Sequence, residues 1–129
     1  GDLATWGTQA NGQPWTVGIA HPDNAAAPFS YINITDLALA TSGNYEKFAV
    51  INGKKYSHTI NPKTGMPVTG IKSVTIIGPN AEIADAMATP VTIMGVKAGI
   101  NLINQIQHLA CIIIDDNNKI YTTKNINLQ

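Results

Sequence analysis

The sequence predicts an α+β domain in which an antiparallel sheet packs against a pair of helices. Short apolar or alternating segments are separated by tight turn signals, which is typical of strands that pair with their sequence neighbours in antiparallel order. Residues 80–106 instead follow helical spacing. Because these helices follow one another and do not alternate with strands, a doubly wound parallel sheet is not expected.

Eight segments have the composition of strands, and most are bounded by turn residues. They are residues 15–20, 31–34, 37–41, 48–51, 54–56, 73–77, 111–114 and 119–122. Asn-Gly at 52–53 predicts a type I′ turn that joins two of them in a hairpin. The His-Pro-Asp-Asn segment and the alanines after it, residues 21–27, are expected to form a loop.

Two helices are expected between the strands. Asn80 is suited to cap the first helix, and Glu82 would lie in its first turn, where the helix dipole favours a negative charge. Apolar residues at 83, 84, 87, 88 and 91 follow helical spacing. Gly95 interrupts this pattern, and residues 97–106 are expected to form the second helix.

The composition fits one globular domain that can bury a core. The chain has 129 residues, of which 44% are apolar and 12% are charged. Eight basic residues balance eight acidic ones without a run of like charge, so no nucleic-acid partner is expected. The single cysteine, Cys111, lies in an apolar run and is expected to be a buried core residue.

Nothing in the sequence indicates a membrane span or a targeting signal. No stretch of about 18 apolar residues occurs, and no signal peptide is visible. The chain opens at Gly1 without a methionine, from which we expect a processed or truncated start.

His58 is the first candidate for a chemical role. It stands where an expected strand enters the segment Asn-Pro-Lys-Thr-Gly-Met-Pro at 61–67. Two prolines stiffen this loop and a glycine opens it, so its side chains and backbone can face a ligand. Histidine can act as a general acid or base near neutral pH. The residues alone leave a structural turn with a polar histidine at its mouth as the alternative.

Asp85 and Thr89 form the second candidate site, because residues four apart share one side of a helix. A carboxylate and a hydroxyl oxygen are hard ligands that suit Mg²⁺. The alternative is an aspartate that favours the helix dipole and a threonine that bonds back to its own helix. Pro90 disfavours helical geometry at Thr89, so we expect a displaced ligand there or a free Ala86 carbonyl.

These segments, in this order, resemble the ApbE family of FAD:protein FMN transferases. The resemblance rests on Gly-Asp at 1–2, Pro-Trp at 14–15, Ala-Thr-Ser-Gly at 40–43, Tyr-Ser-His and its loop at 56–67, and Ala-Asp-Ala-Met-Ala-Thr at 84–89. It departs from the family at Asn44 and Asn61, where the family usually has aspartate. Since asparagine is nearly isosteric with aspartate, we expect the geometry to survive.

The resemblance implies a T-fold-like architecture in which residues 1–129 form the C-terminal half of a flavin transferase domain. It implies that FAD is split at its pyrophosphate, AMP leaves, and FMN is joined to a threonine of an acceptor flavoprotein. It makes Asp85 and Thr89 ligands of Mg²⁺, places His58 near the flavin phosphate, where it would assist proton transfer, and gives Thr59 a backbone contact with the flavin. It also implies a bacterial protein of the periplasm or a membrane-anchored lipoprotein.

The same resemblance places much of the FAD pocket and another metal contact in an N-terminal half that these residues lack. This chain alone is therefore expected to be inactive and to need that half as a partner. Two alternatives to the enzyme stay open. One is a non-catalytic flavin-binding module, and the other is a structural T-fold-like domain that works through oligomerisation.

Overall fold

A computed structural model describes residues 2–21, 24–43, 48–51, 54–57, 60–66 and 69–126. Its main element is a five-stranded sheet in which every neighbouring pair of strands is antiparallel, in the order β1-β4-β7-β8-β9. The strands of this sheet are β1 (Asp2–Ala4), β4 (Ala38–Gly43), β7 (Ile71–Gly78), β8 (Ala110–Asp115) and β9 (Ile120–Thr122). The predicted α+β class is therefore confirmed. β1, which no pattern in the sequence predicts, forms one edge of the sheet.

Two further strand pairs stand outside this sheet. The first joins β2 (Trp15–His21) to β3 (Asn24–Ile34), and the second joins β5 (Phe48–Ile51) to β6 (Lys54–Ser57). The second pair confirms the predicted hairpin, whose Asn-Gly turn lies outside the described residues.

The loop predicted for residues 21–27 is wrong, because β3 already begins at Asn24. The pairing between β2 and β3 shifts where Ala20 faces Pro28, which is one register step away from Ile19 facing Ser30. A proline is tolerated at such an irregularity, because the ladder does not need its missing N–H there. The strand therefore continues through a segment whose composition is typical of a loop.

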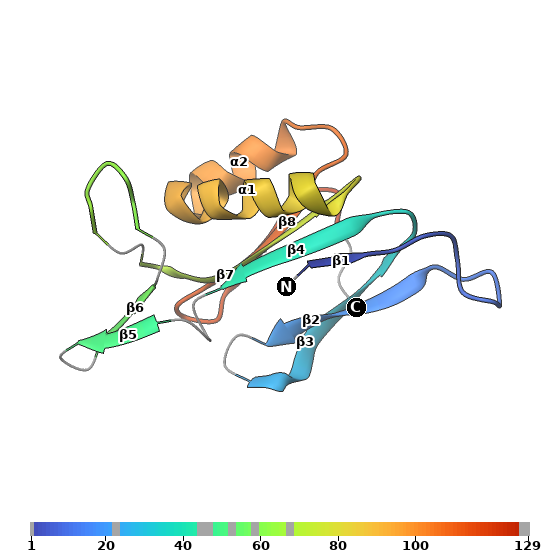
Figure 1. Ribbon diagram of the computed structural model, residues 1–129, viewed down its shortest axis with the longest axis horizontal. Coiled ribbons are helices and arrows are strands. Elements are labelled where there is room, and N and C mark those ends of the chain that lie inside the picture. Colours follow the sequence, from blue (N-terminus) through green and yellow to red (C-terminus); the bar gives the residue numbers. More distant parts are fainter. Residues whose placement is uncertain are drawn as a thin grey trace.

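The helices α1 (Ala81–Met94) and α2 (Val96–Asn104) cover one face of the sheet, as Figure 1 shows. They bury the first core, which contains Ala40, Val74, Ile76, Ala84, Ala88, Val91, Ile103, Cys111 and Ile113. Cys111 is fully buried, as predicted, and burial raises the pKa of its thiol to about 12. It is thus a packing residue and not a nucleophile at neutral pH.

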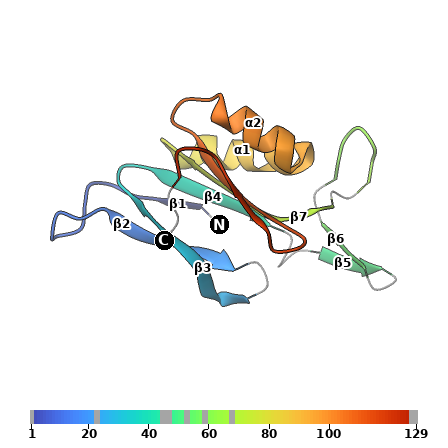
Figure 2. The same cartoon turned by 180° about the vertical axis from the view of Figure 1, so that it is seen from behind.

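The β2–β3 hairpin lies on the opposite face of the sheet, which makes the fold three layers thick (Figure 2). Its side chains Ile19, Ile32 and Ile34 meet Leu39, Ile77 and Ile112 of the sheet in a second core. Because side chains alternate along a strand, neighbouring residues of β4 and β7 contribute to different cores.

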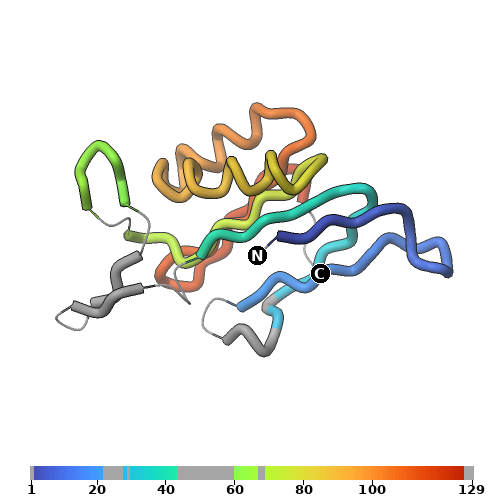
Figure 3. The backbone as a smooth tube through the Cα atoms, viewed as in Figure 1, coloured from blue at the N-terminus to red at the C-terminus, as the bar shows by residue number. Residues whose placement is uncertain are grey.

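The chain leaves the sheet at the end of β4 and returns to it at the start of β7. The loop 60–66 stands beyond this end of the sheet, where the backbone trace can be followed in Figure 3. None of the helices in the described part of the chain is long and apolar enough to cross a bilayer.

Candidate functional site

The start of α1 and the side that it buries determine which way the side chains of Asp85 and Thr89 face. The Asn80 side chain accepts a hydrogen bond from the Ile83 N–H at 2.9 Å, which confirms it as the N-cap. Ala84, Ala88 and Val91 face the sheet and are buried. Asp85 and Thr89 are therefore turned away from the core, and both are exposed. Ile83, which the spacing assigned to the buried side, is 41% exposed.

The side chains of Asp85 and Thr89 make no hydrogen bond or ion pair with any part of the chain that the structure describes. A buried neighbour shows the contrast, since the Thr92 hydroxyl donates to the Ala88 carbonyl at 2.8 Å. Thr89 does not bond back to its own helix in this way, which removes the structural alternative for that residue. The Asp85 carboxylate and the Thr89 hydroxyl are thus available to a ligand from outside.

Pro90 does not break α1, which runs without interruption from Ala81 to Met94. The expected displacement of Thr89 is therefore wrong, because a proline can stay inside a helix when the chain on both sides is held by packing. The expected free Ala86 carbonyl does follow, because Pro90 has no N–H to donate to it. Ala86 and Pro90 are both exposed, so water can hydrate that carbonyl.

The end of β4 carries the Ala-Thr-Ser-Gly segment. Ala40 belongs to the core under α1, so alternation places Ser42 on the same face and Thr41 on the opposite face. α1 begins beside the end of β7 and runs back over β7 and β4 (Figure 1). Its later turns, with Thr89, therefore lie toward the end of β4 at which Ser42 and Gly43 stand.

The loop after the predicted histidine is held by its own hydrogen bonds. The Asn61 side chain accepts from the Lys63 N–H at 2.9 Å, and the Asn61 carbonyl accepts from the Gly65 N–H at 2.8 Å. Gly65 adopts a φ of 69°, a left-handed conformation that glycine takes without strain. A carboxylate at position 61 would accept the Lys63 bond equally well, so asparagine there preserves the turn.

His58 and Thr59 lie outside the described residues, so their predicted roles remain predictions. Within the described part of the chain, no three His, Cys, Asp or Glu side chains come together in a way that could hold a metal ion. A metal at Asp85 and Thr89 would accordingly need further ligands from solvent, substrate or another part of the protein.

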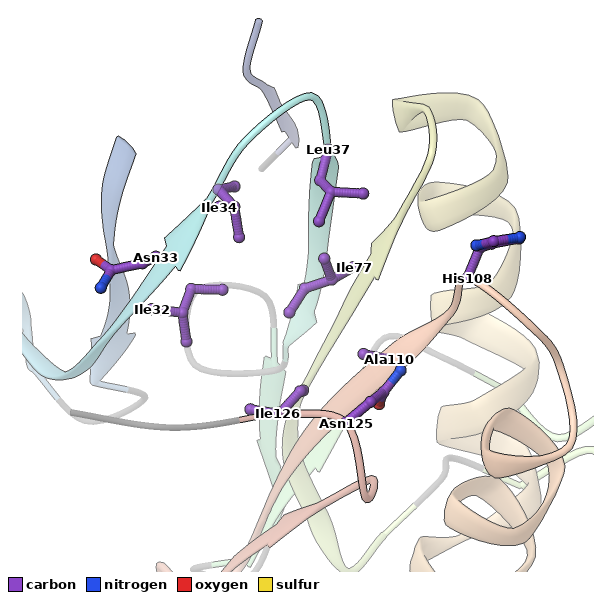
Figure 4. Close-up of a pocket in the computed structure, with 9 residues that line it drawn as sticks. All are labelled: Ile32, Asn33, Ile34, Leu37, Ile77, His108, Ala110, Asn125 and Ile126. Carbon is purple, nitrogen blue, oxygen red and sulfur yellow. The ribbon is translucent and has the colours of Figure 1, made fainter. Parts of the chain in front are cut away.

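A cavity of about 380 Å³ lies on the other side of the sheet (Figure 4). Apolar side chains from β3, β7, β8 and the C-terminal segment surround it, with His108 and Asn125 at its rim. The residues that line it are Ile32, Asn33, Ile34, Leu37, Ile77, His108, Ala110, Asn125 and Ile126. None of the predicted site residues contributes to this cavity, and no sequence motif indicated it.

Comparison with known proteins places this geometry in a family. A model of the ApbE family matches residues 1–113. The FAD:protein FMN transferase of Salmonella typhimurium is 37% identical over 99 residues, which are 75% of this chain and 28% of that protein. The enzyme of the same name from Vibrio cholerae is 33% identical over 127 residues, which are 95% of this chain and 38% of that protein.

Solved structures agree with the sequence comparisons. The ApbE protein of Thermotoga maritima superimposes with a TM-score of 0.83 and 31% identity over 96% of this chain and 40% of that one. The flavin transferase ApbE of Vibrio cholerae gives a TM-score of 0.73 and 30% identity over the same shares. The chain thus spans less than half the length of these relatives. Since the family match covers most of its residues, the chain belongs to the ApbE family.

Proposed function

We propose that the protein containing this chain transfers FMN from FAD to a threonine of an acceptor flavoprotein, in a Mg²⁺-dependent reaction that releases AMP. The relatives named FAD:protein FMN transferase support flavin transfer with FAD as the donor. The structural observation that carries the proposal is the pair Asp85 and Thr89. They are exposed one helical turn apart on α1, with no partner within the described residues.

This pair fits Mg²⁺ by the chemistry of its donor atoms. Mg²⁺ prefers oxygen ligands, usually keeps several waters and is commonly held by one or two protein side chains together with substrate phosphates. The Asp85 carboxylate and the Thr89 hydroxyl would supply the protein oxygens. Bound in this way, the ion would neutralise charge on the pyrophosphate of FAD as the bond to AMP breaks.

The transfer itself exchanges the phosphoanhydride bond of FAD for a phosphoester bond to the acceptor. The hydroxyl oxygen of the acceptor threonine bonds to the phosphorus on the FMN side of FAD, and the bond from that phosphorus to the bridging oxygen breaks. AMP leaves with the bridging oxygen, and the hydroxyl proton must pass to a base. We assign that base to His58 and a backbone contact with the flavin to Thr59, both on the strength of the family resemblance.

The relatives are more than twice as long as the part that this chain matches, which supports a second part of the same protein as its partner. We propose that an N-terminal half supplies the rest of the FAD pocket and a further metal contact. The outer edge of β1 supports this, because β1 pairs with β4 on one side and has no described strand on the other. Such an open edge favours pairing with another segment.

The test uses the complete encoded protein with FAD, Mg²⁺ and a candidate acceptor flavoprotein. AMP release is followed by chromatography, and the mass gain of the acceptor reports bound FMN. The proposal expects both products, and their loss when EDTA removes Mg²⁺. Flavin binding without AMP would support the non-catalytic flavin-binding module instead. A protein that neither binds FAD nor releases AMP would support the structural module.

A further inference from the structure

The turn that leads into β2 contains an asparagine followed by a glycine. Gly12 closes this turn by donating its N–H to the Gln9 carbonyl at 2.9 Å, and its φ of 80° is a left-handed conformation that glycine takes without strain. The Gln9 N–H donates in turn to the Gln13 carbonyl at 2.8 Å. Asn11, at the tip of the turn, is exposed, and so are the two residues after it.

The two groups that can react with each other in this turn are neighbours along the chain. The backbone nitrogen of the residue after an asparagine can attack the asparagine Cγ, because the new bond closes a five-membered ring. A side chain on that next residue crowds the attack, and glycine has none. Within the part of the chain that the structure describes, Asn11 is the only asparagine that precedes glycine. Asn61 is the opposite case, since Pro62 has no N–H to lose.

Hydrogen bonds hold both reacting groups in the folded turn. The Gly12 N–H, which must lose its proton, is donated to Gln9, and Asn11 Oδ1 accepts from the Gln13 N–H at 3.0 Å. The Gln9 side chain adds a brace, because its Nε2 donates to the Pro14 carbonyl at 2.6 Å. The two side-chain bonds are exposed to water, so each contributes little and the turn can open locally. The folded turn therefore slows the attack without preventing it.

We propose that Asn11 is a site of spontaneous deamidation and that opening of the 9–13 turn sets its rate. The Gly12 nitrogen gives its proton to a base in solution and bonds to the Asn11 Cγ. The bond from Cγ to Nδ2 breaks, and this nitrogen takes up a proton and leaves as ammonia. One water molecule then opens the ring at either of its two carbonyls. One product is aspartate, and the other is isoaspartate, in which the main chain runs through Cγ.

Either product changes the turn. Both replace a neutral amide with a carboxylate that is ionised at neutral pH. Aspartate keeps an oxygen that can accept from the Gln13 N–H. Isoaspartate adds one methylene to the main chain of a turn that is closed by hydrogen bonds between Gln9 and both Gly12 and Gln13. Isoaspartate should therefore break these bonds and loosen the approach to β2.

Ageing of the complete encoded protein tests the proposal. The parent is incubated at neutral and at mildly alkaline pH, and peptide mapping by mass spectrometry follows the change from amide to carboxylate at each asparagine. Asn11 should convert before every other described asparagine, and faster at the higher pH, because the attack needs a deprotonated Gly12 nitrogen. Asn52 also precedes glycine but lies outside the described residues, so it is not ranked. In guanidinium chloride the unfolded chain should convert at Asn11 about 5- to 100-fold faster, the range of two lost hydrogen bonds.

Two glutamine variants test the part that the turn plays. Gln9→Ala removes the bond to the Pro14 carbonyl and should raise the rate at Asn11 about two- to tenfold in the folded protein, with no effect in the unfolded chain. Gln107→Ala is the matched control, because Gln107 is an exposed glutamine outside this turn. Asn11→Gln should remove the fast site altogether, since attack on the longer side chain must close a larger ring.

Three results would overturn the inference. The first is conversion of Asn11 no faster than that of Asn80, which precedes alanine. The second is an equal rate at Asn11 in the folded and the unfolded chain. The third is an equal rate at Asn11 in Gln9→Ala and Gln107→Ala. None of these measurements involves flavin, so their outcome is independent of the proposed function.

Discussion

Pro90 stands four residues after Ala86 within α1, and it leaves the Ala86 carbonyl without the N–H that a helix normally provides. The helix nevertheless continues for another turn and ends where the Gly95 N–H donates to the Val91 carbonyl at 3.2 Å. The buried Val91, directly after the proline, ties this last turn to the core. Packing therefore holds a conformation that the local sequence disfavours.

Replacing this proline should stabilise the protein. Pro90→Ala restores the missing donor and relieves the contact of the ring with the preceding turn, so we expect the free energy of unfolding to rise by about 1–3 kcal/mol. Urea unfolding followed by circular dichroism measures it. Pro62→Ala in the exposed loop is the control and should change stability by less than about 0.5 kcal/mol. A Pro90→Ala variant that is no more stable than the parent would show that the helix bears no strain there.

Removing the carboxylate from the candidate metal site should change the response to Mg²⁺. Asp85→Ala should shift the Mg²⁺ titration of FAD cleavage to at least about tenfold higher concentration, because the site loses its charged oxygen. Glu82→Ala removes an exposed carboxylate from the first turn of the same helix and should leave the titration unchanged. If the titration curves of Asp85→Ala and the parent overlay, Asp85 serves only the helix dipole.

The predicted role of His58 can be tested independently of the metal. In the complete protein, His58→Ala should lower the rate of FMN transfer at least about tenfold, the effect of a lost acid–base or positioning group. Folding should be nearly unchanged, as judged by thermal unfolding. Transfer by the variant at the rate of the parent would remove His58 from the site.

We expect the 129 residues alone to associate and to bind FAD weakly. The β1 edge is open within the described residues, and Leu3 on it is 39% exposed, so another segment or a second copy can cover it. Light scattering gives the mass in solution, and flavin fluorescence gives the affinity for FAD. A monodisperse monomer that binds FAD at sub-micromolar concentration would place the whole pocket within this chain.

The β8–β9 turn should make stability depend on pH in acid. The Lys119 and Asn117 N–H groups and the Tyr121 hydroxyl donate to the Asp115 carboxylate and lower its pKa below the ordinary value. A lowered pKa in the folded state means that this stabilisation is present above the unfolded pKa of about 3.9 and is lost as the pH falls through the folded pKa.

Asp115→Asn should therefore flatten the fall of stability below about pH 4, which urea unfolding at several pH values measures. Parallel profiles for Asp115→Asn and the parent would show that these bonds do not contribute in acid.

The strands and helices with clear periodicity could be predicted, because the spacing of their apolar residues and their capping residues depend only on neighbouring positions in the sequence. The apolar run at 111–114 became β8, and the capped segment after Asn80 became α1. β1 could not be predicted from Asp2–Ala4, because three residues carry no period and their pairing with β4 depends on tertiary contact. The start of β3 was missed for a related reason, since pairing with β2 overrides its loop-like composition.

The same distinction between local pattern and tertiary contact applies to the polar residues discussed above. Asp85 and Thr89 share a side of α1 because helical geometry alone puts them there. The pairing of Thr41 with Thr75 joins residues 34 positions apart, so it depends on the register between two strands that no local pattern encodes.

The pairing of β4 with β7 makes the intervening segment a detachable module. Gly43 lies opposite Ser73 in the register, although residues 44–72 separate them along the chain. A short hairpin turn could therefore join the two strands directly and keep both helices, the Thr41–Thr75 contact and the sheet apart from Ile71 and Lys72 at the start of β7. Such a shortened protein would lack His58 and its loop but retain Asp85 and Thr89. It would divide the domain into a scaffold that carries the proposed metal ligands and an insert that carries His58, and we expect each part to be exchangeable between relatives.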